Sequence, residues 1–236
     1  PAGIASVDFW YNGPSDYSGY SLYHSMYETY YAVENLIDRG FHCTAALTKM
    51  WIELGRAFSD STILPFDLEN YAKQLSFDTK KFLAAHSVSY QRNYNLNMTH
   101  LQVLVENFSK NTKDLQQIIN QYKIKNRVDR EDFLYTENRK GLSILHYRQI
   151  NDFLMDFERM FLTPHGLLGR EFVDKHLLYA TSQYDSYVVA TFPSLDDYNM
   201  DRIIRNGTTV LENMQRQFAL ICSTLDEANF SIGRAI

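Results

Sequence analysis

Hydrophobic residues recur every three or four positions through most of the chain, which is the spacing of one buried face of an amphipathic helix. The strongest run, in residues 99–125, places Leu101, Leu104, Val105, Phe108, Leu115, Ile118, Ile119 and Tyr122 on such a face. Similar patterns predict helices at about 25–39, 45–58, 67–85, 130–161 and 200–227, with a possible break at Gly141. Long helices with short connections are typical of an antiparallel helical bundle, so the predicted fold class is mainly α.

Three segments depart from this helical pattern. Residues 3–11 are short, β-branched and aromatic, and the turn-forming residues 12–16 follow them, which predicts one strand. No later segment offers that strand a partner. Residues 163–169 and 179–193 interrupt the bundle as irregular stretches. Long ordered loops often carry function, so these two are candidates for a functional role.

Tyrosines gather around one histidine near the N-terminus: six of the fifteen residues from 17 to 31 are Tyr, and they flank His24. Because buried phenols need hydrogen-bond partners, this density favours the wall of a polar site over a purely apolar core. Ser25 and Glu28 form a capping-box pattern that would start a helix with His24 at its mouth. The alternative is that His24 only caps that helix or pairs with Glu28 one turn on.

Composition excludes some classes of function. The 236 residues are 45% hydrophobic and 22% charged, as in ordinary globular proteins. A net charge of -5 without runs of Lys or Arg argues against nucleic acid as a partner. No window approaches 18 consecutive apolar residues, so no membrane contact is expected. The chain starts without Met or a signal peptide, which we interpret as a piece of a longer protein.

Cysteines and glycosylation sequons say less about function. Cys43 and Cys222 could pair or stay free. Four sequons occur, where roughly two are expected by chance. Alone, they are a weak indication of secretion; they begin at Asn97, Asn107, Asn206 and Asn229.

Recognisable catalytic motifs are otherwise missing from the sequence. There is no His-Glu-x-x-His, no adjacent Glu pair, no Gly-x-Ser-x-Gly and no phosphate-binding glycine loop. The other histidines are scattered singly and are interpreted as ordinary surface or core residues: His42, His86, His100, His146, His165 and His176. Only His24 has a chemically suggestive context.

The segment Ser18–Tyr30 closely resembles the one that carries the last zinc ligand in the glutamate carboxypeptidase II family of zinc peptidases, relatives of transferrin receptor. The resemblance implies that His24 binds zinc, that Tyr23 hydrogen-bonds the tetrahedral intermediate and that Tyr20 lines the substrate pocket. Further landmarks at 64–67, 161–167 and 192–193 follow in the family's order. The resemblance therefore extends from about residue 3 to 225.

By this resemblance, residues 1–31 are the tail of the zinc-peptidase α/β domain with its active-site segment, and residues 32–236 are a C-terminal helical dimerisation domain. The implied function is to close the substrate pocket of an exopeptidase and to form a homodimer. The fragment alone would be inactive, because the other ligands of two zinc ions would lie upstream. The parent would be a single-pass membrane protein with this part extracellular or lumenal, and Asn107 matches a glycosylated asparagine of the family.

Substrate recognition is where the sequence departs from the family. Tyr187 resembles the tyrosine that contacts the C-terminal glutamate of the substrate, but Ser186 stands where the glutamate-specific enzymes have a lysine. Asp8 and Trp10 stand where those enzymes have an arginine patch. Because recognition of carboxylates relies on such cations, a strict preference for acidic substrates does not follow.

The competing hypothesis is a non-catalytic, transferrin-receptor-like dimerisation and protein-binding domain. The retained Tyr23 and His24 pair argues against it, since a receptor has no use for a zinc ligand. The missing carboxylate-binding positions argue mildly for it.

Overall fold

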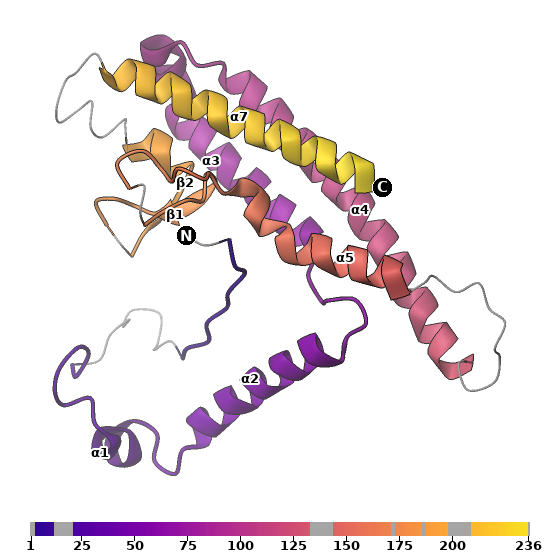
Figure 1. Cartoon of the computed structure of the whole chain (residues 1–236). Coiled ribbons are helices and arrows are strands. Elements are labelled where there is room, and N and C mark those ends of the chain that lie inside the picture. The colour runs from indigo at the N-terminus through magenta and orange to yellow at the C-terminus, as the bar shows by residue number, and fades with distance from the viewer. Residues whose placement is uncertain are drawn as a thin grey trace. The chain divides into compact units, whose positions relative to one another are not determined.

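The computed structural model describes residues 3–11, 21–132, 144–170, 173–185, 187–197 and 209–235. The chain divides into two compact units (Figure 1). The larger unit comprises Phe66–Ile236 together with Pro1–Ala5, and the smaller unit comprises Ser6–Pro65. Each unit is described by itself.

Three long helices form the larger unit: α3 (Leu68–Tyr94), α4 (Met98–Asp132) and α7 (Thr209–Ala235). Helix α4 packs against both α3 and α7 (Figure 1). The predicted apolar stripes form the core between them, and the mainly α fold class is confirmed. Within the described ranges no helix is long and apolar enough to span a membrane. Fully buried core residues include Leu75, Leu101, Phe108, Ile119, Met214, Ile221 and Leu225.

Helix α3 begins where the sequence predicts but ends later than predicted. Asp67 caps α3 as predicted, because its carboxylate accepts the N–H of Asn70 at 2.9 Å. The predicted end of this helix near residue 85 is wrong, since α3 continues to Tyr94. Buried Tyr90 and Tyr94 extend its inner face through a polar stretch that hid the periodicity. Helix α3 then ends at Asn95, whose backbone has the left-handed conformation with φ of 54°.

The predicted helix at 130–161 is divided in the structure. Helix α4 runs on to Asp132, and α5 spans Ile144–Asp156 and is followed by the 3-10 helix η2 (Glu158–Phe161). Gly141, the proposed break, lies outside the described residues. The start predicted at residue 200 for the last helix also lies outside them, while its end extends beyond 227 to Ala235.

The stretch at 179–193, expected to be irregular, contains a β-hairpin. Strands β1 (Tyr179–Thr181) and β2 (Val189–Thr191) pair antiparallel, with Ala180 opposite Ala190. Residues 193–197 are helical. These strands are too short for their alternation to stand out in the sequence.

The smaller unit contains α1 (Tyr30–Ala32), which passes into the π-helical segment η1 (Val33–Ile37), and α2 (His42–Asp60). The helix predicted at 45–58 is confirmed within α2. The helix start predicted at Ser25 is wrong, because residues 21–27 form turns and Thr29 caps the helix instead. The Ser25 hydroxyl donates to the carbonyl of Leu22 at 2.7 Å.

The Asp38 side chain stabilises the first turn of helix α2 through hydrogen bonds. Its carboxylate accepts the backbone N–H groups of Cys43 and Thr44 at 3.0 and 2.7 Å, and also the Thr44 hydroxyl at 2.8 Å. These hydrogen bonds, first of all that from the Thr44 backbone, lower the pKa of Asp38 to about 2. Both described cysteines are free: Cys43 is exposed and Cys222 is buried.

The strand predicted at residues 3–11 does not form. This segment makes isolated contacts instead: the Tyr11 hydroxyl donates to the carbonyl of Cys43 at 3.2 Å, and the Phe9 ring lies edge-on to Trp51 at 4.9 Å. A strand needs a ladder partner, and the described residues provide none here.

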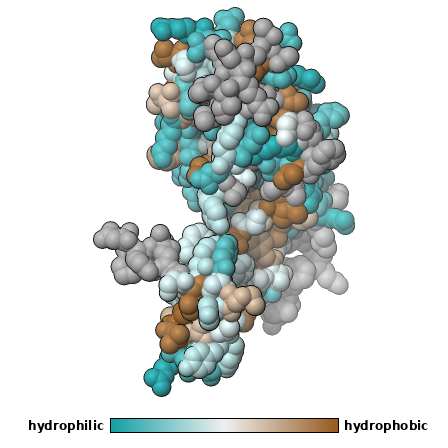
Figure 2. Space-filling view, turned by 90° about the vertical axis from the view of Figure 1, so that its left-hand side faces the viewer, coloured by the Kyte–Doolittle hydropathy of each residue, from teal (hydrophilic) through white to brown (hydrophobic). Residues whose placement is uncertain are grey.

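Helix α2 leaves its predicted apolar stripe largely uncovered. It contains no buried residue, and Met50, Trp51 and Ile52 are exposed. Among the described residues of the smaller unit only Ala32, Asp38 and Ile63 are buried. Figure 2 shows hydrophobic residues at the surface among hydrophilic ones. The described part of this unit therefore does not enclose a hydrophobic core of its own.

Candidate functional site

The turn around His24 has a defined backbone conformation. His24 is left-handed, with φ of 57°, and its N–H donates to the Glu28 carboxylate at 3.0 Å. The Ser25 hydroxyl accepts the N–H of Tyr27 at 3.2 Å. The pairing of His24 with Glu28 that the sequence left open is thus present through the His24 main chain.

The side chains of Tyr23 and His24 stack on each other. Their ring centroids are 3.9 Å apart and the planes are inclined by 17°. Both residues are exposed, so an imidazole and a phenol lie together at the surface of this unit. An imidazole can bind a metal, and a phenol can donate a hydrogen bond to a developing negative charge. Tyr20, the third predicted residue, lies outside the described residues.

A zinc centre needs more ligands than this turn provides. Catalytic zinc usually has three protein ligands and an open position for water. In the described ranges no group of three His, Cys, Asp or Glu side chains could hold a metal ion. His24 therefore stands as a single candidate ligand.

Tyr187, the predicted substrate-contacting residue, lies in the turn of the β1–β2 hairpin. Its N–H donates to the Asp185 carboxylate at 3.0 Å, and the residue is 79% exposed. Ser186 lies outside the described residues. Tyr187 belongs to the larger unit and His24 to the smaller one, so their proposed joint role stays a prediction.

A buried ion-pair network supports the hairpin, and sequence analysis missed it. The Arg170 guanidinium contacts the carboxylates of Asp174 and Asp197, each at 2.9 Å, and donates to the carbonyl of Thr181 at 2.6 Å. The three charged side chains are only 9%, 6% and 6% exposed. Burial raises the pKa of the Asp197 carboxyl, while the charge of Arg170 opposes that shift. The four-residue spacing of Arg170 and Asp174 was the only local signal.

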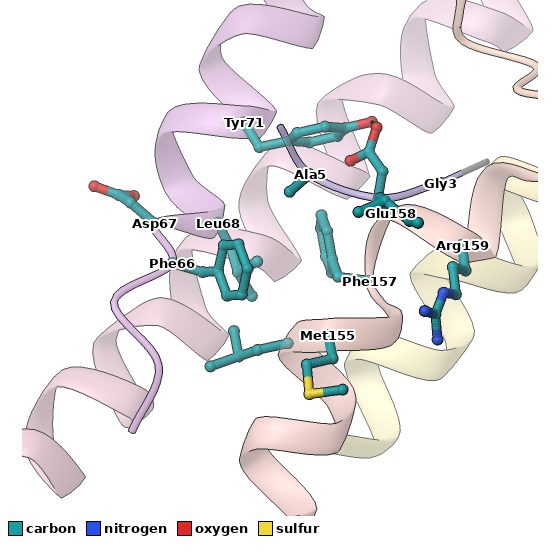
Figure 3. Close-up of a pocket in the computed structure, with 12 residues that line it drawn as sticks. Gly3, Ala5, Phe66, Asp67, Leu68, Tyr71, Met155, Phe157, Glu158 and Arg159 are labelled. Atoms are coloured by element: carbon teal, nitrogen blue, oxygen red, sulfur yellow. Dashed lines mark hydrogen bonds between the residues drawn. The ribbon is translucent and has the colours of Figure 1, made fainter. Parts of the chain in front are cut away.

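A second polar cluster lies beside a cavity of about 260 Å³ between the start of α3 and η2 (Figure 3). The Tyr71 hydroxyl donates to Glu158 Oε1 over 3.4 Å, and His176 Nε2 lies 2.8 Å from the same oxygen. No hydrogen bond forms at this nitrogen, so the contact is a close polar approach. Burial, and next the charge of Glu158, raise the pKa of Tyr71 well above its usual value.

His176 has a structural role within this cluster. Its Nδ1 accepts the backbone N–H groups of Leu178 and Tyr179 at 3.2 and 3.1 Å. A ring nitrogen that accepts hydrogen bonds carries no proton, so the proton of the imidazole is on Nε2 and the ring is neutral. The residue is 3% exposed, which fits its interpretation as an ordinary core histidine.

The sequons lie in different environments. Asn107 is exposed on α4, Asn97 caps α4 by accepting the N–H of His100 at 3.1 Å, and Asn206 lies outside the described residues. Asn229 lies half-buried between α7 and α4. Its Nδ2 donates to the carbonyl of Leu104 at 3.1 Å, and its Oδ1 accepts from the Asn111 amide at 3.2 Å.

We expect an N-glycan on Asn107 and none on Asn229 when the protein is produced in a secretory pathway. The glycan bond forms at Nδ2, and in Asn229 this atom is hydrogen-bonded within the helix interface. Mass spectrometry of glycopeptides checks this, with Asn107→Gln as the variant that should lose the sugar. A glycan on Asn229 of the folded protein would contradict the expectation.

The chain is similar to a known domain family and to several known proteins. A family model described as the transferrin receptor-like dimerisation domain matches residues 96–232. The probable glutamate carboxypeptidase VP8 of Zea mays is 31% identical over 83% of this chain and 24% of its own length. The probable glutamate carboxypeptidase LAMP1 of Arabidopsis thaliana is 28% identical over 89% and 27%, respectively. Aminopeptidase NAALADL1 of Rattus norvegicus is 26% identical over 96% and 28%.

The residues matched by this family model include helices α4, α5 and most of α7 of the larger unit. The chain belongs to the transferrin receptor-like dimerisation domain family. Similarity to glutamate carboxypeptidase-like proteins over most of the chain confirms the resemblance seen in the sequence. The chain spans about a quarter of the length of these curated relatives.

Proposed function

We propose that this chain is the C-terminal part of a zinc-dependent, glutamate carboxypeptidase-like exopeptidase, in which it closes the substrate pocket and mediates homodimerisation. The observation that carries the proposal is the similarity to peptidases over nearly the whole chain. The match to aminopeptidase NAALADL1 covers 96% of the chain and therefore includes the His24 turn as well as the helices. The dimerisation-domain model begins at residue 96 and does not include that turn.

In this proposal His24 supplies one imidazole to a zinc site, and Tyr23 donates a hydrogen bond to the oxygen that gains negative charge during peptide hydrolysis. Tyr20, Tyr187 and Ser186 line the pocket for the peptide substrate. The described residues do not fit a complete zinc centre, because a single imidazole falls short of the three ligands that catalytic zinc requires. The remaining ligands of two zinc ions would come from other parts of a longer protein, so this chain alone is inactive.

The test is peptidase activity of the full-length protein and its His24→Ala variant, assayed with zinc on peptides ending in acidic or neutral residues. We expect the substitution to lower kcat/KM by more than about 100-fold, since even residues that only orient metal ligands are worth 10–100-fold. The preferred peptide would show whether Ser186 has relaxed the preference for acidic residues.

His100→Ala is the matched control, because His100 is an exposed histidine on α4 and should leave activity unchanged. Circular dichroism would establish that each variant is folded, and zinc analysis would measure how much metal each retains, which should fall in the His24→Ala variant. Full activity in the His24→Ala variant would overturn the role of His24. No activity in a folded, zinc-loaded wild-type protein would overturn the peptidase proposal.

A non-catalytic dimerisation and protein-binding domain is the second candidate, because the matching family model describes dimerisation alone. A dimer in light scattering, combined with no peptidase activity in the full-length protein, would favour it. Under either candidate we propose that this part of the protein lies on the extracellular or lumenal side of a single-pass membrane protein. A glycan on Asn107 would support that location.

A further inference from the structure

The cavity between α3 and η2 is lined by aromatic rings and by two acidic residues, Glu158 and Asp67, and the Asp67 carboxylate is already hydrogen-bonded to Asn70. The rings of Phe66, Tyr71 and Phe157 line it, and the Glu158 carboxylate lies next to the Tyr71 hydroxyl (Figure 3). Leu68 and Met155 complete the apolar lining. A carboxylate attracts cations through its negative charge, and the face of an aromatic ring attracts them through the ring quadrupole.

The charge of Glu158 is not neutralised by the basic groups nearest to it. His176 contacts Glu158 Oε1, but its ring is neutral because Nδ1 accepts two backbone N–H groups. The Arg159 guanidinium pairs with Asp156 at 2.7 Å and points away from the Tyr71 end (Figure 3). Glu158 thus provides a net negative charge beside apolar surface.

The main chain of residues 3–5 forms one side of this cavity. Gly3 packs so closely that a Cβ on it would lie 2.8 Å from Leu162 Cδ1 and 3.1 Å from the Arg159 Cα atom. Its φ of +61° also disfavours other residues. Only glycine allows the chain to approach this wall, so one side of the cavity depends on a specific backbone conformation.

We propose that this cavity binds a small organic cation, in which an ammonium group on a short apolar body contacts Glu158 and the rings of Phe66, Tyr71 and Phe157. The volume of about 260 Å³ lies just below that of typical ligand pockets and suits a body of a few carbons. The ammonium group forms a charge-assisted hydrogen bond with the carboxylate. This site is separate from the peptidase proposal and does not depend on it.

The first experiment titrates the isotope-labelled full chain with n-butylammonium and with 1-butanol, its neutral counterpart of similar size, and follows amide chemical shifts. We expect millimolar binding of n-butylammonium, at least about tenfold tighter than that of 1-butanol, with shifts at residues lining the cavity. Equal binding of the two probes, or shifts confined to other surfaces, would overturn the proposal. This comparison needs no variant.

Two variants test whether Glu158 and Phe66 bind the cation. Glu158→Gln should reduce the preference for n-butylammonium by about tenfold and leave 1-butanol unaffected. Phe66→Leu should weaken n-butylammonium more than 1-butanol, because it removes an aromatic face and keeps apolar bulk. Glu106→Gln, at an exposed position of α4, is the matched control. An unchanged preference in folded Glu158→Gln would overturn the proposal, and Phe66→Leu serves as the test should Glu158→Gln fail to fold.

The cation could be a free amine or a lysine side chain of a partner, and a third probe separates these sources. Nα-acetyl-lysine methylamide presents the same ammonium group attached to a backbone. Tighter binding than n-butylammonium assigns the cation to a lysine side chain, and weaker binding assigns it to a free amine. Either result supports a cation site, whereas binding of neither probe overturns it.

Discussion

Replacing Arg170 with methionine is expected to lower the free energy of unfolding of the larger unit by about 3–5 kcal/mol. The Arg170 guanidinium pairs with the carboxylates of Asp174 and Asp197, and each of the three side chains is less than 10% exposed. Methionine fills similar space but leaves two buried carboxylates without a partner. Urea denaturation followed by circular dichroism measures the loss.

The pH dependence of the Arg170→Met variant provides a second readout. Burial raises the pKa of the Asp197 carboxyl above that of an ordinary aspartate, and removing Arg170 takes away an interaction that opposes this shift. A carboxyl with a raised pKa in the folded state binds more protons there than in the unfolded chain. The deficit of the variant should therefore shrink as the pH falls from neutral toward 4.

Arg159→Met is the matched control for this prediction. Arg159 also pairs with a carboxylate, Asp156 at 2.7 Å, but its side chain is 50% exposed. Exposed pairs contribute about 0–1 kcal/mol, so the control should change stability little. Equal losses in the two variants would show that the burial of the Arg170 network does not determine its energy.

Phe161→Ala is expected to lower the free energy of unfolding by about 3–5 kcal/mol, because it opens a cavity in the centre of an aromatic cluster. The Phe161 ring is fully buried. Its centroid lies 5.9 Å from that of Tyr71, 5.7 Å from Phe108 and 6.1 Å from Phe157. These rings belong to α3, α4 and the segment around η2, so they cannot easily collapse together.

The control for Phe161→Ala is Phe77→Ala on α3. Phe77 is 53% exposed and Lys81 lies over its ring at 4.3 Å, so its removal should cost less than about 1 kcal/mol. Chemical denaturation of both variants tests the difference. A loss below about 1 kcal/mol for Phe161→Ala would mean that the aromatic cluster repacks around the missing ring.

Much of the fold could be predicted because helices depend on residues close in sequence. The Leu101 and Phe108 stripe of α4 is visible from its spacing, and the Asp67 cap lies three residues from the N–H that it accepts. The helix start near Ser25 could not be placed in the same way. Ser25 and Thr29 both fit a cap, and the main-chain turn around His24 decided between them.

The His24 turn was singled out because its residues are contiguous and resemble those of a known family. The cavity beside Glu158 could not be found in this way, since it combines residues from three separate segments. Even the state of His176 follows from contacts: two backbone N–H groups keep its Nδ1 unprotonated. The same holds for Asn229, whose sequon gives no indication that its amide lies in a helix interface.

The sequence by itself determined the helical class, several helix boundaries and the family, because periodicity, capping and local motifs are encoded within a few residues of one another. Only the tertiary structure decided which polar groups share a buried site. Tyr71 and Glu158 are 87 positions apart, and Asn229 and Leu104 are 125 apart. Such pairs are set by how helices pack, and helix packing depends on the shapes of whole faces rather than on any short stretch of sequence.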